Sequence, residues 1–589
     1  MKKEFYHILI LAIFLLTFGC NPDELDVTPD GRISLSEVFS NVKMTESYLN
    51  SCYAYTNYGG TRYFFFAALA GLEDSFFDSD YTEGLMATDW YNGKMTSNDD
   101  PLGNSGTSDW NGYIWERYWE GIRKCNVFIK NIETAPVEKE TNRTRFKAEA
   151  TVLRDWYLFE LCKKYGPLPT VTEPFSLDFD FTKLTRPTFQ EVADFIAKDM
   201  DQAVATDELP WRFTSSAERG RMTKAIAITL KSQAQLFAAS PLHNTTNDQT
   251  RWVKARDYAK DAVSKLTAQG FQLYYKQELG AKSFYDYFLN QQDLSQSPKD
   301  RETIYEPWAD QPTYGGRMWH INGFPTCTAQ FKAGSCPTQE LVDAFDMQST
   351  GLPVIDPVNR YKDSDHLNPN YMTNSGYDAN NPYTGRDPRF YATVIYNGAY
   401  EKGVDQTVWT YVGGNNGIQS NSRKHTFTGY YTCKYWDREA PGNTSCGGFW
   451  KKMRLAELYL NWAEAENEVD GPNADVYSII KVIRDRAEMP NIKAGITSKD
   501  EMRAYIQKER MTEFAFEEQR FWDVRRWKIL DKTDKLVTGM KIVKNGDNSF
   551  NYSRFVIGYR KSWNDKFLLF PIPVGEGAIM GANWQNPGW

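Results

Sequence analysis

The stretch from Glu501 to Lys528 constrains the fold of this chain more than any other. It contains no glycine or proline, so the sequence predicts one long helix. At about 100° per residue, one sector of that helix is apolar at both ends and charged in the middle. The charged side chains of this sector are Glu509, Glu513, Glu517 and Arg520. An inward face of this kind needs partners for its charges within the fold.

Two interpretations of the charged sector compete. Carboxylates four residues apart on an inward helix face can ligate metals in a helix bundle, but that design uses a Glu-x-x-His pair. None of the five histidines lies in the stretch. The alternative is a buried ionic network in which arginines of the same stretch neutralise the glutamates. These arginines are Arg510, Arg520, Arg525 and Arg526. We favour the network, which makes the helix a structural element.

The first 35 residues indicate export and anchoring. Lys2 and Lys3 precede a short apolar run, which predicts a secretory signal over residues 1–19 that is too short for a membrane span. Cys20 directly follows Gly19, an arrangement that resembles the lipobox of a bacterial lipoprotein. In such proteins the cysteine is lipidated and becomes the new N-terminus. We therefore expect residues 20–35 to be a tether, with a plain signal and an incidental Cys20 as the alternative.

The body of the chain divides into three parts by pattern. Helical periodicity dominates residues 36–269, which also contain early loops, and returns in residues 449–589. Residues 270–448 are dense in Gly, Asn, Tyr and Trp and carry few helical signals. Helices of about twenty residues joined by short turns resemble tetratricopeptide units. The sequence thus predicts a mainly α fold with a long, loop-rich middle region, which we expect to be functional.

Charge and aromatic content narrow the classes of ligand. The net charge of −8 is spread along the chain without a basic patch, which argues against nucleic acid. Aromatic residues make up 15% of the chain, and many lie in segments with no helical period. We therefore do not expect all of the aromatic residues to lie in the core.

Two pairs of cysteines each flank a glycine-containing loop. They are Cys327 with Cys336, and Cys433 with Cys446. In an exported protein such pairs can form disulfides, although spacing alone does not establish them.

An acidic run near the start of the body is a candidate calcium site. Asp74, Asp78 and Asp80 could supply the several oxygen ligands that calcium needs. The regular spacing and the closing glutamate of a calcium loop are missing, so we favour a solvated acidic loop. Structural calcium is the one cofactor that the sequence leaves open.

Several motifs occur together, and their order identifies a family resemblance. They include AEATVLRDWY at 148–157, KYGPLP at 164–169, PTQELVD at 337–343, LAELYLNWAEAE at 455–466 and EFAFE at 513–517. From lipobox to last residue the chain resembles the SusD/RagB family of outer-membrane nutrient-binding lipoproteins of Bacteroidota.

The resemblance implies a mainly helical fold with four tetratricopeptide-like helix pairs as scaffold. It implies a lipid-anchored protein on the outer-membrane surface that captures glycans and passes them to a TonB-dependent transporter of the SusC type. Members of the family are not enzymes, so we expect no catalytic residue. The motifs above belong to the scaffold and leave the ligand open.

The resemblance also places the expected ligand contacts in two loops, one early and one just before the PTQELVD motif. The early loop holds Asp74, Trp90 and Tyr91. The second loop holds Trp308, Tyr314, Arg317, Trp319 and His320. Trp90, Tyr314 and Trp319 are the strongest candidates for stacking on a sugar.

Two other functions are weighed against glycan capture. A relative in the same lid role could bind peptides or another polymer. A glycoside hydrolase would need two carboxylates facing each other across a cleft. The 76 acidic residues offer many pairs, but no motif points to one.

Overall fold

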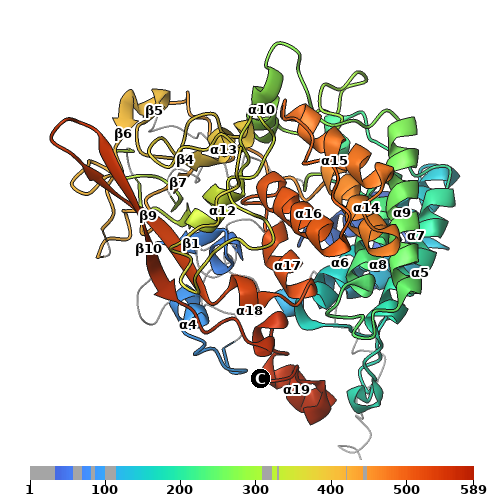
Figure 1. The fold of residues 1–589 in the computed structure, drawn as a ribbon. Coiled ribbons are helices and arrows are strands. Elements are labelled where there is room, and N and C mark those ends of the chain that lie inside the picture. The colour runs from blue at the N-terminus through green and yellow to red at the C-terminus, as the bar shows by residue number, and fades with distance from the viewer. Residues whose placement is uncertain are drawn as a thin grey trace, which may run out of the picture.

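The computed structural model describes residues 33–56, 69–80, 86–99, 114–307, 321–327, 330–419, 421–441 and 448–589. In these residues helices fill one half of the molecule, while short strands and loops fill the other (Figure 1). The predicted signal and Cys20 lie outside the described residues. None of the described helices has an apolar stretch long enough to cross a bilayer.

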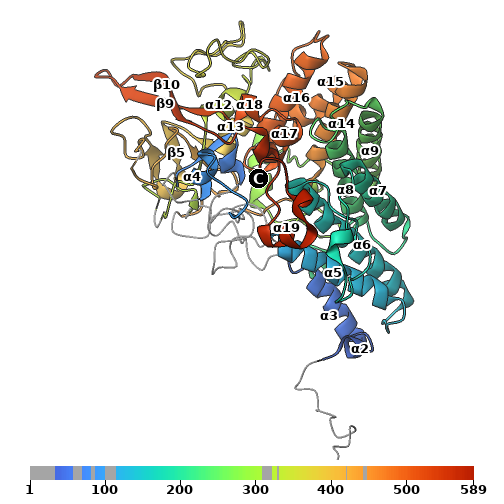
Figure 2. The ribbon, with the colours of Figure 1, turned by 90° about the horizontal axis from the view of Figure 1, so that it is seen from below.

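The helical half is a stack of neighbouring helices. Its members are α3 (Val42–Cys52), α5 (Ile114–Ile132), α6 (Glu140–Tyr165), α7 (Phe189–Ala205), α8 (Lys224–Ala239), α9 (Gln249–Ala268), α14 (Leu455–Asp470), α15 (Ala474–Arg486) and α16 (Lys499–Glu513). Helix α5 packs on α6, α7 on α8 and α8 on α9, while α9 packs on α14 from much later in the chain (Figures 1 and 2). The predicted mainly α class with a scaffold of helix pairs is confirmed.

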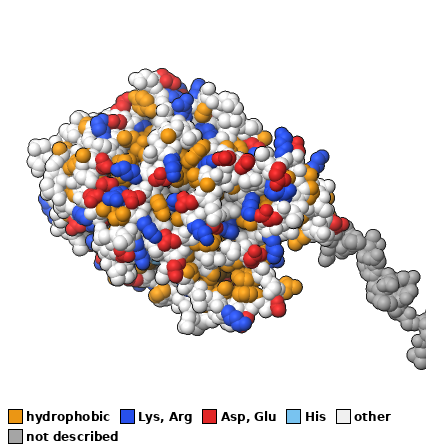
Figure 3. Space-filling view, turned by 90° about the vertical axis from the view of Figure 1, so that its right-hand side faces the viewer, with side chains coloured by type: hydrophobic (Ala, Val, Ile, Leu, Met, Phe, Trp, Pro, Cys, Tyr) orange, Lys and Arg blue, Asp and Glu red, His pale blue; other side chains and the backbone are white. Residues whose placement is uncertain are grey.

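The outer side of this stack is a mosaic of opposite charges. Figure 3 shows Lys and Arg side chains interspersed with Asp and Glu, with hydrophobic side chains in small groups. Charges of both signs make such a face hydrophilic and leave it without a strong electrostatic potential of either sign. This face fits the absence of a basic patch in the sequence.

The other half is built from short elements that hold long loops. The helices are α4 (Met86–Tyr91), α10 (Ser283–Leu289), α12 (Gln339–Ala344), α13 (Pro388–Thr393), α17 (Gln519–Arg526) and α18 (Leu530–Thr533). Two further short helices lie at the helical half: α2 (Leu35–Val38) contacts α3, and α19 (Val574–Met580) contacts the turn Phe181–Lys183 between α6 and α7 (Figure 2). The antiparallel strand pairs are β1 (Phe76–Asp78) with β3 (Ser335–Pro337), β2 (Thr303–Tyr305) with β8 (Met453–Arg454), β4 (Val394–Ile395) with β7 (Tyr431–Thr432), β5 (Ala399–Glu401) with β6 (Gln406–Val408), and β9 (Leu536–Lys544) with β10 (Phe550–Tyr559).

Strands far apart in the sequence therefore tie the three parts of the chain together. Strand β1 of the early region pairs with β3, and β2 of the middle region pairs with β8 just before α14. The β9–β10 hairpin in the C-terminal part was not predicted from the sequence. It projects from the body beside the strand-rich half (Figure 1).

The long helix expected over residues 501–528 is wrong in one respect, because the chain breaks it into α16 and α17. Phe516 and Glu518 adopt left-handed backbone angles, with φ of 61° and 66°. Such angles are costly for residues other than glycine, so tertiary contacts must hold them. Lys434 supplies one by donating a 2.8 Å hydrogen bond to a backbone carbonyl within the break. The residues of the break favour a helix locally, and the tertiary contact with the buried Lys434 ammonium outweighs this preference.

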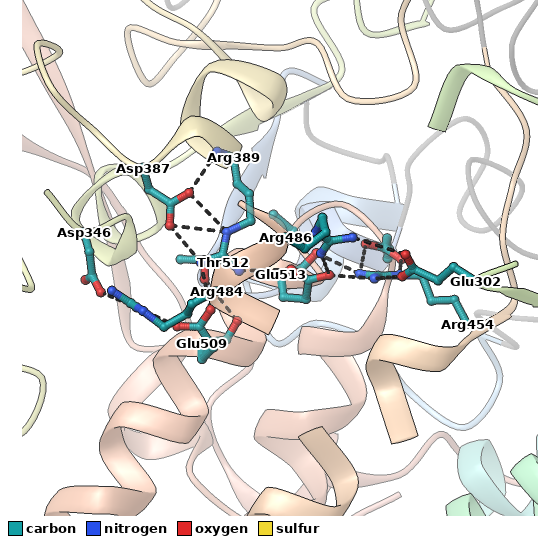
Figure 4. A network of polar contacts seen from close by, with 12 residues as sticks. Glu302, Asp346, Asp387, Arg389, Arg454, Arg484, Arg486, Glu509, Thr512 and Glu513 are labelled. Atoms are coloured by element: carbon teal, nitrogen blue, oxygen red, sulfur yellow. Dashed lines mark hydrogen bonds and ion pairs between the residues drawn. The ribbon is translucent and has the colours of Figure 1, made fainter. Parts of the chain in front are cut away.

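The ionic network predicted for this stretch is confirmed and is the centre of the fold (Figure 4). Arg454 lies 2.6 Å from Glu513, 2.7 Å from Glu517 and 2.9 Å from Glu302. Arg389 joins Glu509 and Glu513 at 2.7 and 2.9 Å. These side chains are buried. Every one of the three predicted inward glutamates therefore has a cationic partner.

The cations of the network are not the predicted ones. Those that meet the glutamates come from other elements, namely Arg389, Lys434, Arg454, Arg484 and Arg486. Arginines of the stretch point elsewhere: Arg510 and Arg526 meet Asp523, and Arg520 meets Asp74. Arg525 has backbone carbonyls as partners. The network thus joins segments instead of closing within one helix.

Nearby arginines keep Glu509 and Glu513 ionised despite burial. Burial alone would raise the pKa of Glu509, but Arg389 and Arg484 outweigh it and lower the pKa to about 2. For Glu513 the balance also falls well below the usual pKa, through Arg486, Arg454 and Arg389.

We predict that Arg454→Met destabilises the protein by about 3–5 kcal/mol, because three buried carboxylates lose a shared partner. The free energy of unfolding from urea denaturation measures this loss. The control is Lys402→Met, since its ion pair with Glu439 is mostly exposed and a change within about 1 kcal/mol is expected. Equal losses in the two variants would show that the network does not hold the fold together.

Candidate ligand-binding site

The second predicted ligand loop lies outside the described residues. Its candidates are Trp308, Tyr314, Arg317, Trp319 and His320. The described chain on either side of this loop is fixed in the core: β2 ends at Tyr305 and β3 begins at Ser335, and both strands are buried. The five residues stay predictions.

Trp90 and Tyr91 of the early loop do not face the solvent, so the expected exposure is wrong for these two residues. Both side chains are buried, with 0% and 1% of their surface exposed. The Trp90 ring packs 4.8 Å from Phe567 and 5.3 Å from Phe570. Packing a large ring against other rings gains more than exposing it, and here the C-terminal segment folds over α4 to provide that cover.

Asp74 is also buried and has a structural partner. Its two carboxylate oxygens each accept a 2.8 Å hydrogen bond from the Arg520 guanidinium. Burial would raise the pKa of Asp74, but Arg520 and a hydrogen bond from Glu73 lower it to about 2. This bidentate pair ties the early region to α17. Asp74 is therefore part of the frame beneath the loops.

The acidic run was expected to be a solvated loop, and this expectation is wrong too. Asp78 and Asp80 are buried and share Lys332, at 3.2 and 2.9 Å. Arg423 approaches Asp80 at 2.6 Å from a third segment. Within the described ranges, no three or more His, Cys, Asp and Glu side chains gather in a way that could hold a metal ion.

One of the two suggested disulfides is absent. Cys336 carries a free, buried thiol, so it is not joined to Cys327. Burial raises the pKa of the Cys336 thiol to about 12. Cys433 is likewise a free thiol, and its suggested partner Cys446 lies outside the described residues.

The structure contains a large cleft that the sequence did not reveal. Its volume is about 900 Å³, within the usual range of small-ligand sites. One wall is α16, and the facing wall is a hairpin-like loop at 355–371, whose two sides are bridged between Ile355 and Tyr371 and between Tyr361 and Pro369. Residues of α12, α17 and α18 complete the lining. No sequence motif could signal this site, since its residues are separated by hundreds of positions.

The lining of the cleft combines charged and apolar side chains. The wall loop contributes Arg360, Tyr361 and His366, and α16 contributes Arg503 and Lys508. Tyr361 and His366 stack with ring centroids 4.1 Å apart and an interplanar angle of 13°. A lining of charged side chains around a stacked pair of rings suits a polar ligand with some flat apolar surface, such as a sugar.

Comparison with family models covers most of the chain. Residues 281–589 match the model described as SusD family, and residues 25–233 match the model described as starch-binding associating with outer membrane. The SusD-like protein P2 of Formosa agariphila is 37% identical over 84 residues, a stretch that covers 13% of this chain and 16% of that relative.

Solved structures share the fold at low identity. A SusD-like protein of Bacteroides fragilis is 24% identical, with 94% of this chain and 99% of that chain covered and a TM-score of 0.74. A SusD-like carbohydrate-binding protein of the same species is 19% identical, with 92% and 99% covered and a TM-score of 0.67. Surface glycan-binding protein A of Bacteroides fluxus is 18% identical, with 93% and 100% covered and a TM-score of 0.56.

We predict that Trp90→Ala acts on stability. Removing a fully buried tryptophan should lower the free energy of unfolding by about 3–5 kcal/mol, as measured by urea denaturation. Trp563→Ala is the control, because that side chain is 39% exposed and its loss should cost less than about 1 kcal/mol. A Trp90→Ala protein with unchanged stability and weakened ligand binding would restore Trp90 as a contact.

Proposed function

We propose, on the premise that the chain belongs to the SusD family, that this protein captures glycans at the surface of the outer membrane. The observation that carries the proposal is the pair of family matches, which extend over residues 25–233 and 281–589. The model that matches residues 25–233 is described as starch-binding, and two proteins of similar fold are named for binding carbohydrate or glycan.

The binding face in this proposal is the loop between β2 and β3. Tyr314 and Trp319 would stack on sugar rings, while Arg317 and His320 would bond hydroxyl groups at the rim. The structure at both ends of this loop supports the proposal: β2 before the loop pairs with β8, and β3 after it pairs with β1. A loop whose ends are fixed loses less entropy on binding than a free one.

We propose further that the protein acts as a lid on a SusC-like TonB-dependent transporter. Lipidated Cys20 would anchor the body through the tether at 20–35, and a single lipid anchor leaves the body free to reorient over its partner. The transporter would take the glycan from the lid and import it as a nutrient.

A lid that binds peptides or another polymer remains the second candidate, because family membership fixes the architecture and leaves the ligand class open. A glycoside hydrolase is a weaker candidate. It would need two carboxylates that face each other across a cleft, and no sequence motif points to such a pair. The arginines that pair with Asp74, Glu509 and Glu513 lower the pKa of each, whereas a general acid needs a raised pKa.

We predict that the protein is retarded in native gels that contain a suitable polysaccharide, and that Trp319→Ala and Tyr314→Ala weaken this binding at least about tenfold. Affinity electrophoresis against a panel of polysaccharides measures the effect. The control is Tyr275→Ala, an exposed ring outside both predicted loops. Retardation by no glycan, with capture of peptides, would favour the second candidate. Released reducing ends on long incubation would instead indicate a hydrolase.

A separate prediction concerns the partner and the anchor. Affinity-tagged protein extracted from outer membranes in mild detergent should co-purify with a TonB-dependent transporter. Cys20→Ser should release the protein from the membrane fraction, because the lipid anchor is lost. A Cys20→Ser protein that stays in the membrane would contradict lipid anchoring, and purification without a transporter would contradict the lid role.

A further inference from the structure

We propose that the cleft between α16 and the 355–371 loop is a second carbohydrate site, and that it selects an acidic sugar whose carboxylate or sulfate is bound by Arg360. This inference rests on the proposed glycan-binding function, and it adds both a place and a ligand class. The cleft lies apart from the loop that holds Tyr314 and Trp319 in sequence, and its volume of about 900 Å³ accommodates a short oligosaccharide.

The first argument is that the carboxylates of the cleft are already engaged. Asp74 is paired with Arg520 and Asp343 with Arg554, each in a two-pronged contact. The other lining carboxylates also have donors: Glu340 (Thr538), Asp363 (Leu367 and Asn368), Glu464 (Arg526 and Trp527), Glu468 (Arg503) and Asp500 (Arg503). The lining therefore has few free acceptors and little capacity for a cation.

The second argument is that Arg360 lacks such a partner. Its guanidinium donates one 2.8 Å hydrogen bond to the backbone carbonyl of Glu340. It also lies over the Tyr361 ring, 5.4 Å from the centroid. Among the described residues no carboxylate forms an ion pair with Arg360. A planar guanidinium with donors to spare is the side chain best suited to hold a carboxylate or sulfate bidentately.

Neighbouring charges do not cancel Arg360. Asp74 and Asp343 contribute to its surroundings, but each is neutralised by its own arginine. Lys532 also lines the cleft, and it forms no ion pair within the described part of the chain. Glu340 and Asp363 have uncharged donors, and one arginine, Arg503, serves both Glu468 and Asp500, so the cleft as a whole is not cationic. The preference for an anion is therefore local to the guanidinium of Arg360, which has donors to spare.

The wall loop is built to hold Arg360 in place. Asp363 accepts hydrogen bonds from the backbone N–H groups of Leu367 and Asn368, at 3.0 and 3.2 Å. The Tyr361 hydroxyl donates to Asp343 at 3.3 Å, and His366 Nδ1 lies 3.1 Å from Glu340. A loop fixed by such contacts needs little reordering when a ligand arrives.

The experiment compares sugars of equal length whose carboxyl groups are either charged or neutralised as methyl esters. Isothermal titration uses oligogalacturonides of three to six residues and their fully methyl-esterified counterparts with the wild-type protein. The acidic oligomers should bind at least tenfold more tightly than the esters, and their affinity should fall as salt rises. Arg360→Gln should remove most of this difference, and Arg360→Lys should retain part of it. Sulfated oligosaccharides provide a second acidic probe.

Controls separate the site from the fold and from the general function. Arg256→Gln removes a surface arginine of α9 that is paired with Asp470, and it should leave acidic binding unchanged. Thermal unfolding of Arg360→Gln should match the wild type. Glycan binding that does not depend on charge or on Arg360 would overturn this inference and leave the proposed function intact. Equally tight binding of acidic peptides such as oligoglutamate at this cleft would also overturn the inference, because the cleft would then not be specific for sugars. Failure to bind any glycan would overturn both.

Discussion

Arg454 donates to three carboxylates from two distant parts of the chain, and most of the architecture follows from that contact. Glu302 comes from the middle region, while Glu513 ends α16 and Glu517 lies in the break before α17. The side chains are buried, so each charge must find its partner inside the protein. No arrangement satisfies this need unless the helical half and the loop-rich half are packed together. The ionic network is the joint between them.

The same requirement shapes the surroundings of both proposed sugar sites. The break between α16 and α17 brings Arg520 to Asp74, which fixes the floor beneath the early region. Helix α16 then forms one wall of the cleft, and the 355–371 loop forms the other. Loops can vary in sequence without loss of the frame, because the frame is held by charges below them. A rigid scaffold with variable loops is a general solution for proteins that recognise diverse ligands.

Much of the fold was predictable from the sequence, and the reasons are physical. Helix pairs follow from periodicity, and the inward glutamates of the 501–528 stretch indicated an ionic network before any coordinates. The sequence could not name the cations, since Arg389 and Arg454 approach from far along the chain. The sequence also led us to expect an exposed Trp90, because this tryptophan lies in a segment without helical periodicity. The sequence does not indicate which distant residues will cover such a ring. Burial is decided by tertiary neighbours, which here are Phe567 and Phe570.

The cleft illustrates a different limit. Its lining joins residues as distant as Asp74 and Thr533, and no local pattern marks them as neighbours. Arg360 looks like an ordinary loop arginine in the sequence. The structure shows that Asp74 and Asp343 near Arg360 are paired with other arginines, and that Arg360 forms no ion pair among the described residues.

The cover over Trp90 has a consequence for how the protein matures. Phe567 and Phe570 are made almost five hundred residues after the ring that they enclose, and Arg520 follows Asp74 by a similar interval. During synthesis the apolar side chains of the early region stay uncovered until the last segment emerges. During this interval the unfolded chain is open both to chaperones and to proteases. Its survival therefore depends on how soon the C-terminal segment arrives to cover Trp90.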